Sequence, residues 1–136
     1  MTRALPSLLL LALLAAGQAS AAAPTKARKP QVDSLRGEVV DLAGYLVDKE
    51  RIGEAYADAA HDVIANGHPA GILSNDGVLY LALGKDFKSP NDLLASYAGK
   101  KVKVTGKKIH RAKMAGFVIE HIEEMPPPKA RPKKKG

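Results

Sequence analysis

Short runs of hydrophobic residues, separated by polar turns, divide the middle of the chain into segments typical of a mainly β protein. Residues 35–47, LRGEVVDLAGYLV, are rich in β-branched and apolar side chains, and their alternation changes phase near Val40 and Asp41. Such a slip within one strand indicates a bulge or a sharp curl. Two further apolar runs, 70–74 and 78–83, flank the hairpin sequence Asn-Asp-Gly. Because VLYLAL (78–83) is apolar throughout, we expect this strand to be central and covered on both faces.

Two segments have the spacing of an amphipathic helix. Residues 54–65 gather their apolar side chains on one stripe, and Asn66-Gly67 is a suitable C-terminal stop. Residues 90–97 follow Ser89, a suitable N-cap, and Leu93, Leu94 and Tyr97 form the expected apolar face.

The last two expected strands, 100–113 and 117–125, flank Met114-Ala115-Gly116, where we place a hairpin turn. Gly106 interrupts the first of these strands at its middle, where a barrel corner would need a bend.

The length of that turn decides which residues face each other across the hairpin. A two-residue Ala115-Gly116 turn would place His110 opposite His121, but it requires Ala115 at positive φ. A three-residue turn with Gly116 in the left-handed conformation is better turn chemistry, and it would place His110 opposite Glu120.

The resulting order is strand, helix, strand, strand, helix, strand, strand. It predicts a mainly β fold with two helices, a five-stranded OB-like barrel. One helix would be inserted between strands 1 and 2, and the other would lie between strands 3 and 4.

Three segments carry a resemblance to a family: GEVVDLAGYLVD (37–48), HPAGILSNDGVLYLALG (68–84) and YAGKKVKVTGKKI (97–109). Together they resemble the small exported bacterial OB-fold-like domains, which are mostly uncharacterised. The resemblance implies an OB-like fold and export. Relatives often carry Cys and His after the first strand, and the matching positions here are Gly44, Tyr56, Ala59 and Val63. None of these can bind a metal ion, so the resemblance implies no metal function for this chain.

The beginning of the chain has the features of a secretory signal peptide. Arg3 supplies a positive charge, residues 8–16 are apolar, and Ala19-Ser20-Ala21 is a small-x-small cleavage signal. We expect residues 1–21 to be the signal peptide, 22–30 a basic Pro-containing linker, 31–125 the OB-like domain and 126–136 a disordered tail rich in Pro and Lys. The protein would then be periplasmic or extracellular, and a run this short predicts no transmembrane segment.

The net charge of +7 comes from the two ends of the chain. Residues 22–30 and 126–136 carry eight positive charges and no acid, whereas residues 31–125 have a net charge of −2. The interior is polarised as well, because residues 100–113 hold seven bases and no acid. This distribution indicates an anionic partner.

The chain has no cysteine, which excludes disulfides, thiol catalysis and Cys-ligated metal centres. It also has no Gly-rich phosphate loop, no His-Glu-x-x-His helix and no Gly-x-Ser-x-Gly elbow. We therefore expect neither an enzyme nor a bound cofactor.

The leading functional hypothesis is an exported binding module whose polybasic tails contact anionic envelope polymers, lipid headgroups or nucleic acid. For nucleic acid, the second and third strands offer only Tyr80 for stacking on bases. The oligomeric state is not readable from the sequence. The candidate anion-binding residues are Lys101, Lys103, Lys107, Lys108, Lys129, Arg131, Lys133, Lys134 and Lys135.

The alternative hypothesis is a periplasmic metal-binding domain that uses histidines and carboxylates. Asp58, His61 and Asp62 fall on one helix face at spacings of three and four, and His110 and His121 lie on the two paired final strands.

Export can be tested on the protein isolated from the cell that makes it. We expect intact-mass analysis to find a chain that begins near Ala22, because Ala19-Ser20-Ala21 is the cleavage signal. Full-length protein recovered from the cytosol would contradict this prediction.

Overall fold

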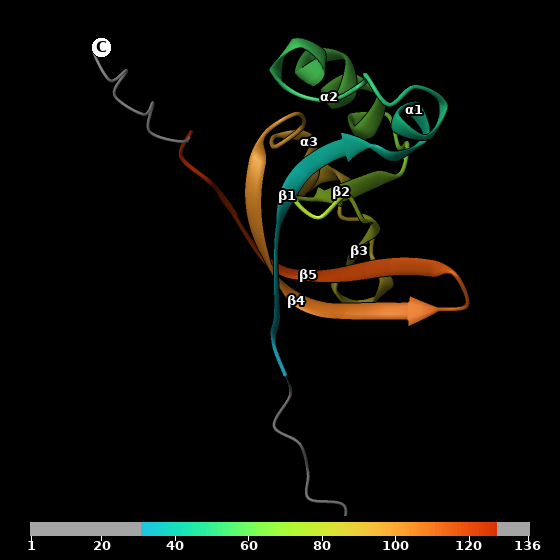
Figure 1. The fold of residues 1–136 in the computed structure, drawn as a ribbon, viewed down its shortest axis with the longest axis vertical. Helices are drawn as coiled ribbons and strands as arrows, with labels where there is room; N and C mark the ends of the chain where they lie inside the picture. The colour runs from blue at the N-terminus through green and yellow to red at the C-terminus, as the bar shows by residue number, and fades with distance from the viewer. Residues whose placement is uncertain (1–30, 128–136) are drawn as a thin grey trace, which may run out of the picture.

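Five strands dominate the fold, and three short α-helices gather at one end of them (Figure 1). The computed structural model describes residues 31–127. Within this range, no helix combines the length and the apolar character needed to cross a lipid bilayer. In chain order the elements are β1 (Asp33–Asp41), α1 (Leu42–Val47), the 3₁₀ turn η1 (Glu54–Tyr56), α2 (Ala57–Ala65), β2 (Ala70–Ser74), β3 (Leu79–Gly84), the 3₁₀ turn η2 (Lys85–Phe87), α3 (Asn91–Ala95), β4 (Lys101–Arg111) and β5 (Met114–Glu124).

The strands hydrogen-bond in the closed order β1-β2-β3-β5-β4. Every neighbouring pair is antiparallel except β3 and β5, which run parallel. β1 closes the ring because its first half pairs with β4 and its second half with β2, the two pairings overlapping at Gly37 and Glu38. The strand curves strongly along this path (Figure 1). The predicted mainly β fold with five strands is therefore confirmed.

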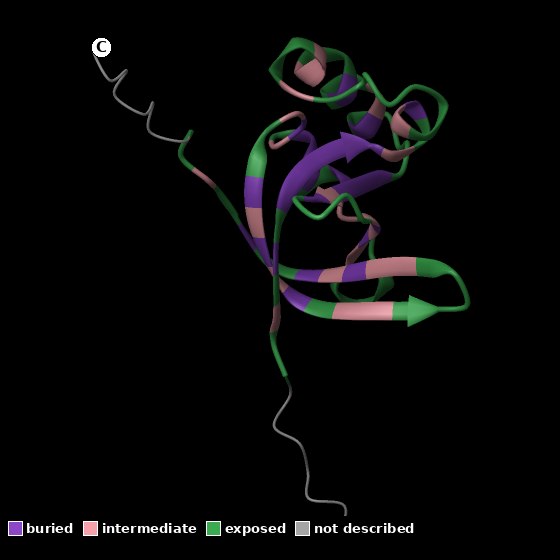
Figure 2. Cartoon of the chain, viewed as in Figure 1, coloured by how far each residue is buried: buried purple, intermediate pink, exposed green. Residues whose placement is uncertain are grey.

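The hydrophobic core fills the space inside this sheet and beneath the helices (Figure 2). Ile64 of α2 and Leu94 of α3 are fully buried, so both helices contribute to the same core as the strands. The largest fully buried side chains are Phe117, Ile64, Ile72, Leu94, Val39, Val40, Val102 and Val104.

The first expected strand, 35–47, is wrong in its second half, because β1 ends at Asp41 and α1 begins at Leu42. The Asp41 carboxylate accepts a hydrogen bond from the Gly44 N–H at 3.1 Å, which caps the new helix. The phase change near Val40 and Asp41 therefore marks a strand-to-helix junction and not a bulge. The expectation of two helices was also wrong, since α1 makes a third.

The strand VLYLAL is covered on only one face. Tyr80 and Ala82 are buried, whereas Leu79, Leu81 and Leu83 are only half-buried. Within residues 31–127 the outer face of β3 carries no complete second layer, so the prediction of cover on both faces was wrong.

The helix expected at 90–97 is present in shorter form as α3. The helix begins at Asn91 with Pro90 at the N-cap position, so the prediction of Ser89 as the N-cap was wrong by one residue, although Ser89 Oγ accepts a hydrogen bond from the Asn91 N–H at 3.3 Å. Leu94 is buried, but Leu93 is largely exposed and does not belong to the apolar face.

The β4–β5 hairpin turns at Ala112 and Lys113, so the turn expected at 114–116 was wrong. His110 faces Ala115 and His121 faces Thr105, which overturns both expected registers for His110. The physical reason lies in β3. Gly116 pairs with Leu81, and a Cβ at Gly116 would come within 3.2 Å of Leu83 Cδ1. Gly116 therefore lies within β5, where it allows β3 to approach closely. The turn is formed by Ala112 and Lys113 instead, and Ala112 adopts φ 54°.

Gly106 bends β4 as predicted. The pairing of β4 with β5 shifts register between Thr105 and Gly106, and the extra residue of this bulge is Glu120 on β5, opposite the bend in β4. Gly106 has φ 157°, and a Cβ there would collide with the carbonyl oxygen of Val118. No other residue fits this backbone without moving β5.

Gly106→Ala should lower the free energy of unfolding by about 2–4 kcal/mol, because the new Cβ meets backbone atoms that have no free space to move into. Gly77→Ala is the matched control. Gly77 also has positive φ, but a Cβ there meets nothing within 4 Å, so the expected loss is only about 1 kcal/mol of backbone strain. Denaturant unfolding measures both variants, and equal losses would contradict the steric role of Gly106.

Candidate anion-binding site

The Gly106 bulge divides the β4–β5 hairpin into two parts with different electrostatic surroundings. We call residues 101–105 and 120–124 the proximal half, and residues 107–118, which include the turn, the distal half. The proximal half of β4 lies between β1 and β5, whereas β4 pairs with β1 no further than Gly106. Figure 2 shows the distal half as mostly exposed or half-buried.

Lysines of the proximal half are held by carboxylates. Lys101 Nζ lies 3.0 Å from Glu38 Oε2, and Lys103 Nζ lies 3.4 Å from Glu123 Oε1. Just before β4, Lys100 Nζ lies 3.1 Å from Glu124 Oε2. Two of the predicted anion-binding residues, Lys101 and Lys103, therefore already have anionic partners within the protein.

Glu38, the partner of Lys101, was not predicted from the sequence to belong to this region. Its side chain is 95% buried, and its second oxygen, Oε1, accepts a hydrogen bond from the Gly53 N–H. The carboxylate thereby joins β1 to β4 and to the loop before η1. A buried carboxylate requires such partners, since desolvation of an unpaired charge is costly. Lys101 thus has a structural task.

The distal half carries four cations that lack such partners: Lys107, Lys108, Arg111 and Lys113. Within residues 31–127, none of their charged groups forms an ion pair. The residues that face them across the hairpin are apolar: Val118 opposite Lys107, Phe117 opposite Lys108 and Met114 opposite Arg111.

The Asp33 carboxylate lies beside this part of β4 and binds a backbone N–H there. Asp33 Oδ2 accepts a hydrogen bond from the Lys108 N–H at 2.8 Å. Side chains alternate along this strand, so Lys107 and Arg111 lie on its outer face, whereas Lys108 lies on the face that contacts Tyr80. Arg111 and Lys113 belong to the basic stretch 100–113 found in the sequence, but they were not among the predicted anion-binding residues.

Lys108 and His110 lie beside the same aromatic ring. Lys108 Nζ is 6.0 Å from the centroid of the Tyr80 ring, and the His110 ring meets Tyr80 edge-on at a centroid distance of 6.0 Å. Tyr80 itself is buried and packs edge-on against Phe117. Its ring is therefore part of the core and presents no open face for stacking on a nucleic-acid base.

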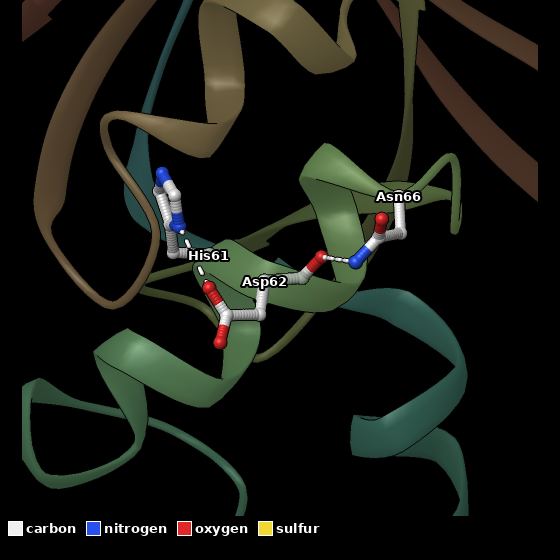
Figure 3. A network of polar contacts seen from close by, with 3 residues as sticks. All are labelled: His61, Asp62 and Asn66. Carbon is white, nitrogen blue, oxygen red and sulfur yellow. Dashed lines mark hydrogen bonds and ion pairs between the residues drawn. The ribbon is translucent and has the colours of Figure 1, made fainter.

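The residues proposed for metal binding are not brought together. His61 Nδ1 lies 3.2 Å from Asp62 Oδ1, and Asn66 Nδ2 donates to the Asp62 carbonyl at 2.7 Å, all on the exposed surface of α2 (Figure 3). Asp58 does not complete a cluster with them. Across residues 31–127 no group of three or more His, Cys, Asp or Glu side chains is placed to hold a metal ion.

His110 and His121 are equally unsuited to a shared site. They face Ala115 and Thr105 respectively, on different sides of the Gly106 bulge. The remaining predicted anion-binding residues, Lys129, Arg131, Lys133, Lys134 and Lys135, lie outside the described residues, as do the expected signal peptide and linker.

The chain matches no protein-family model, no curated protein and no solved structure in a comparison with each.

The two kinds of lysine can be separated by stability measurements. Lys101→Met should lower the free energy of unfolding by about 1–2 kcal/mol, since it leaves the buried Glu38 carboxylate without its cation; the exposure of Lys101 keeps the loss below that of a fully buried pair. Lys107→Met should change it by less than about 0.5 kcal/mol. Chemical denaturation measures both. A loss at Lys107 as large as that at Lys101 would mean that the distal cations also stabilise the fold.

Proposed function

We propose that this chain is an exported, non-enzymatic OB-like binding domain that contacts anionic partners. The distal half of the β4–β5 hairpin and the basic terminal segments supply the cations. The observation that carries the proposal is the sorting of charge along β4. Lysines before the bulge are neutralised by carboxylates, whereas the cations beyond it form no ion pair with a carboxylate among the described residues. Charges that the fold does not use remain available to an external anion.

The strand pairing supports the OB-like assignment. An OB-fold is a five-stranded Greek-key barrel, and here five strands pair in a closed order with a helix, α3, between the third and fourth strands. The helical insertion between β1 and β2, comprising α1, η1 and α2, lies where the sequence predicted a single helix.

The buried polar side chains favour a binding module over a catalyst, because each has a structural task. Glu38 holds Lys101 and the Gly53 N–H, and Asp41 caps α1. Ser74 Oγ accepts from the Val78 N–H in the β2–β3 turn. Asn91 Nδ2 donates to the carbonyls of Ile64 and His68, which ties α3 to the end of α2.

A phosphate- or sulfate-bearing surface suits this site better than the bases of a single-stranded nucleic acid. Base recognition on an OB barrel relies on aromatic side chains that stack. Tyr80, the aromatic residue of β3, is buried. The cations Lys107, Lys108, Arg111 and Lys113 instead offer point contacts with anionic groups along one edge of the hairpin.

Charge neutralisation on either side of the bulge tests the proposal. The double variant Lys107→Gln/Lys108→Gln should bind dextran sulfate, a soluble polyanion, about tenfold more weakly than the unchanged chain. The steepness of log affinity against log salt should decrease by about one to two, because binding releases fewer counterions when two cationic contacts are lost. The matched control, Lys100→Gln/Lys103→Gln, removes the same charge from the same region of the chain and should bind nearly as well as the unchanged chain.

Deletion of residues 126–136 should weaken binding further, with little change in melting temperature. Equal losses in the two double variants would show that only net charge matters, and the assignment of the distal half would then be wrong.

A further inference from the structure

An apolar groove runs along the outer face of β3, between α1 and the hairpin turn. It has a volume of about 290 Å³. Leu42 and Leu46 of α1 form one wall, Leu79 and Leu81 form the floor, and Met114 and Ala115 form the other wall, with Lys113 at its edge.

A second hollow of about 140 Å³ continues the groove across the hairpin. It shares Leu81, Met114 and Ala115 with the first and ends at Ile109 and Arg111. The half-buried outer face of β3 is thus the floor of one continuous apolar surface, which we call the β3 groove.

The wall formed by α1 packs close to the sheet because Gly71 of β2 has no side chain. A Cβ at Gly71 of β2 would lie within 2.8 Å of Leu42 Cδ1 and 3.2 Å of Leu79 Cδ1. Both leucines therefore pack over the bare backbone of Gly71, and the groove is a preformed feature of the fold.

Large apolar side chains project from the rim of the β3 groove. Leu46 is 68% exposed and Met114 is 66% exposed. Arg111 and Lys113 flank Met114 in the turn, and neither is in an ion pair within residues 31–127. The turn and α1 lie on the same side of the molecule (Figure 1). One face thus combines protruding apolar groups with free cations.

We propose that this face seats the protein on an anionic lipid bilayer. Leu46 and Met114 enter the boundary between headgroups and acyl chains, while Arg111 and Lys113 contact lipid phosphates. The long stems of the two cations allow their charged ends to stay at headgroup level as the apolar groups enter. The inference rests on the proposed function and names its partner.

Charge decides between the bilayer and other occupants of the groove. In a symmetric dimer the same patch lies on both sides of the interface, so Arg111 and Lys113 of both copies would be buried there, and the residues that line the β3 groove include no carboxylate to pair with them. A soluble polyanion would satisfy the cations but leave the apolar rim in water. An anionic bilayer satisfies both parts of the surface.

Insertion into the bilayer can be measured by tryptophan fluorescence, because the chain contains no tryptophan of its own. Met114→Trp, in the full chain, places one fluorophore on the rim. Its emission should shift to the blue with phosphatidylcholine vesicles that contain phosphatidylglycerol, and brominated acyl chains should quench it. Phosphatidylcholine vesicles alone should have little effect.

Phe87→Trp is the matched control. Phe87 is 99% exposed and follows the opposite end of β3 from Leu79, so its emission should not shift. A shift at position 87 without one at position 114 would overturn the proposal. A blue shift at position 114 that grows with protein concentration in the absence of vesicles would also overturn it, in favour of a second copy.

A second pair of measurements separates this inference from the proposed function. Leu46→Ser/Met114→Ser should bind anionic vesicles about tenfold more weakly and dextran sulfate unchanged, with folding checked by circular dichroism. Unchanged vesicle binding in this variant would refute insertion and leave anion binding in place. If Lys107→Gln/Lys108→Gln lost affinity for neither probe, the proposed function itself would fail.

Discussion

The steric constraint at Gly106 organises the rest of the molecule. At this residue β4 leaves β1 and continues with β5 alone, so one long hairpin both closes the sheet and projects beyond it. The bulge brings the Gly106 backbone against the Val118 carbonyl, where a side chain would collide. Bulges at barrel corners bend a strand in this way. β5 can therefore pair with β4 on one side and run parallel to β3 on the other.

Charge follows the same division. Before the bulge, lysines lie between strands that carry carboxylates, and Glu38 is buried deeply enough to require both Lys101 and the Gly53 N–H. Beyond the bulge the cross-strand neighbours are apolar, and β4 has no strand on its other side within residues 31–127. Cations on such an edge oppose pairing with another chain. They also leave the hairpin with a charge that an external anion can satisfy.

The cationic edge and the apolar β3 groove meet at the hairpin turn. The turn places Arg111, Lys113 and Met114 within four residues, and Ala112 between them adopts φ 54°. A non-glycine residue in this region costs about 1 kcal/mol. The strand pairing on both sides of the turn holds Ala112 in this conformation, and Gly116 lies where β5 approaches Leu83 closely. Two surfaces with different chemistry are thereby joined on one side of the protein.

Local signals in the sequence determined much of the fold. Asn75-Asp76-Gly77 located the β2–β3 hairpin, residues 54–65 gave a helix, and Gly106 marked the bend, because each depends on backbone conformations set by a few neighbours. The site was only partly predictable. Lys107 and Lys108 were found by charge alone. Arg111 and Lys113 belong to the same basic stretch, but only the structure shows that they form no ion pair within residues 31–127. Only the tertiary structure decided that Gly116 serves packing against β3, that Asp41 starts a helix, and that Lys101 and Lys103 are neutralised while Lys107 and Lys108 are not. The carboxylate of Glu38 lies far from Lys101 in the sequence, and whether a lysine is paired depends on which strands become neighbours.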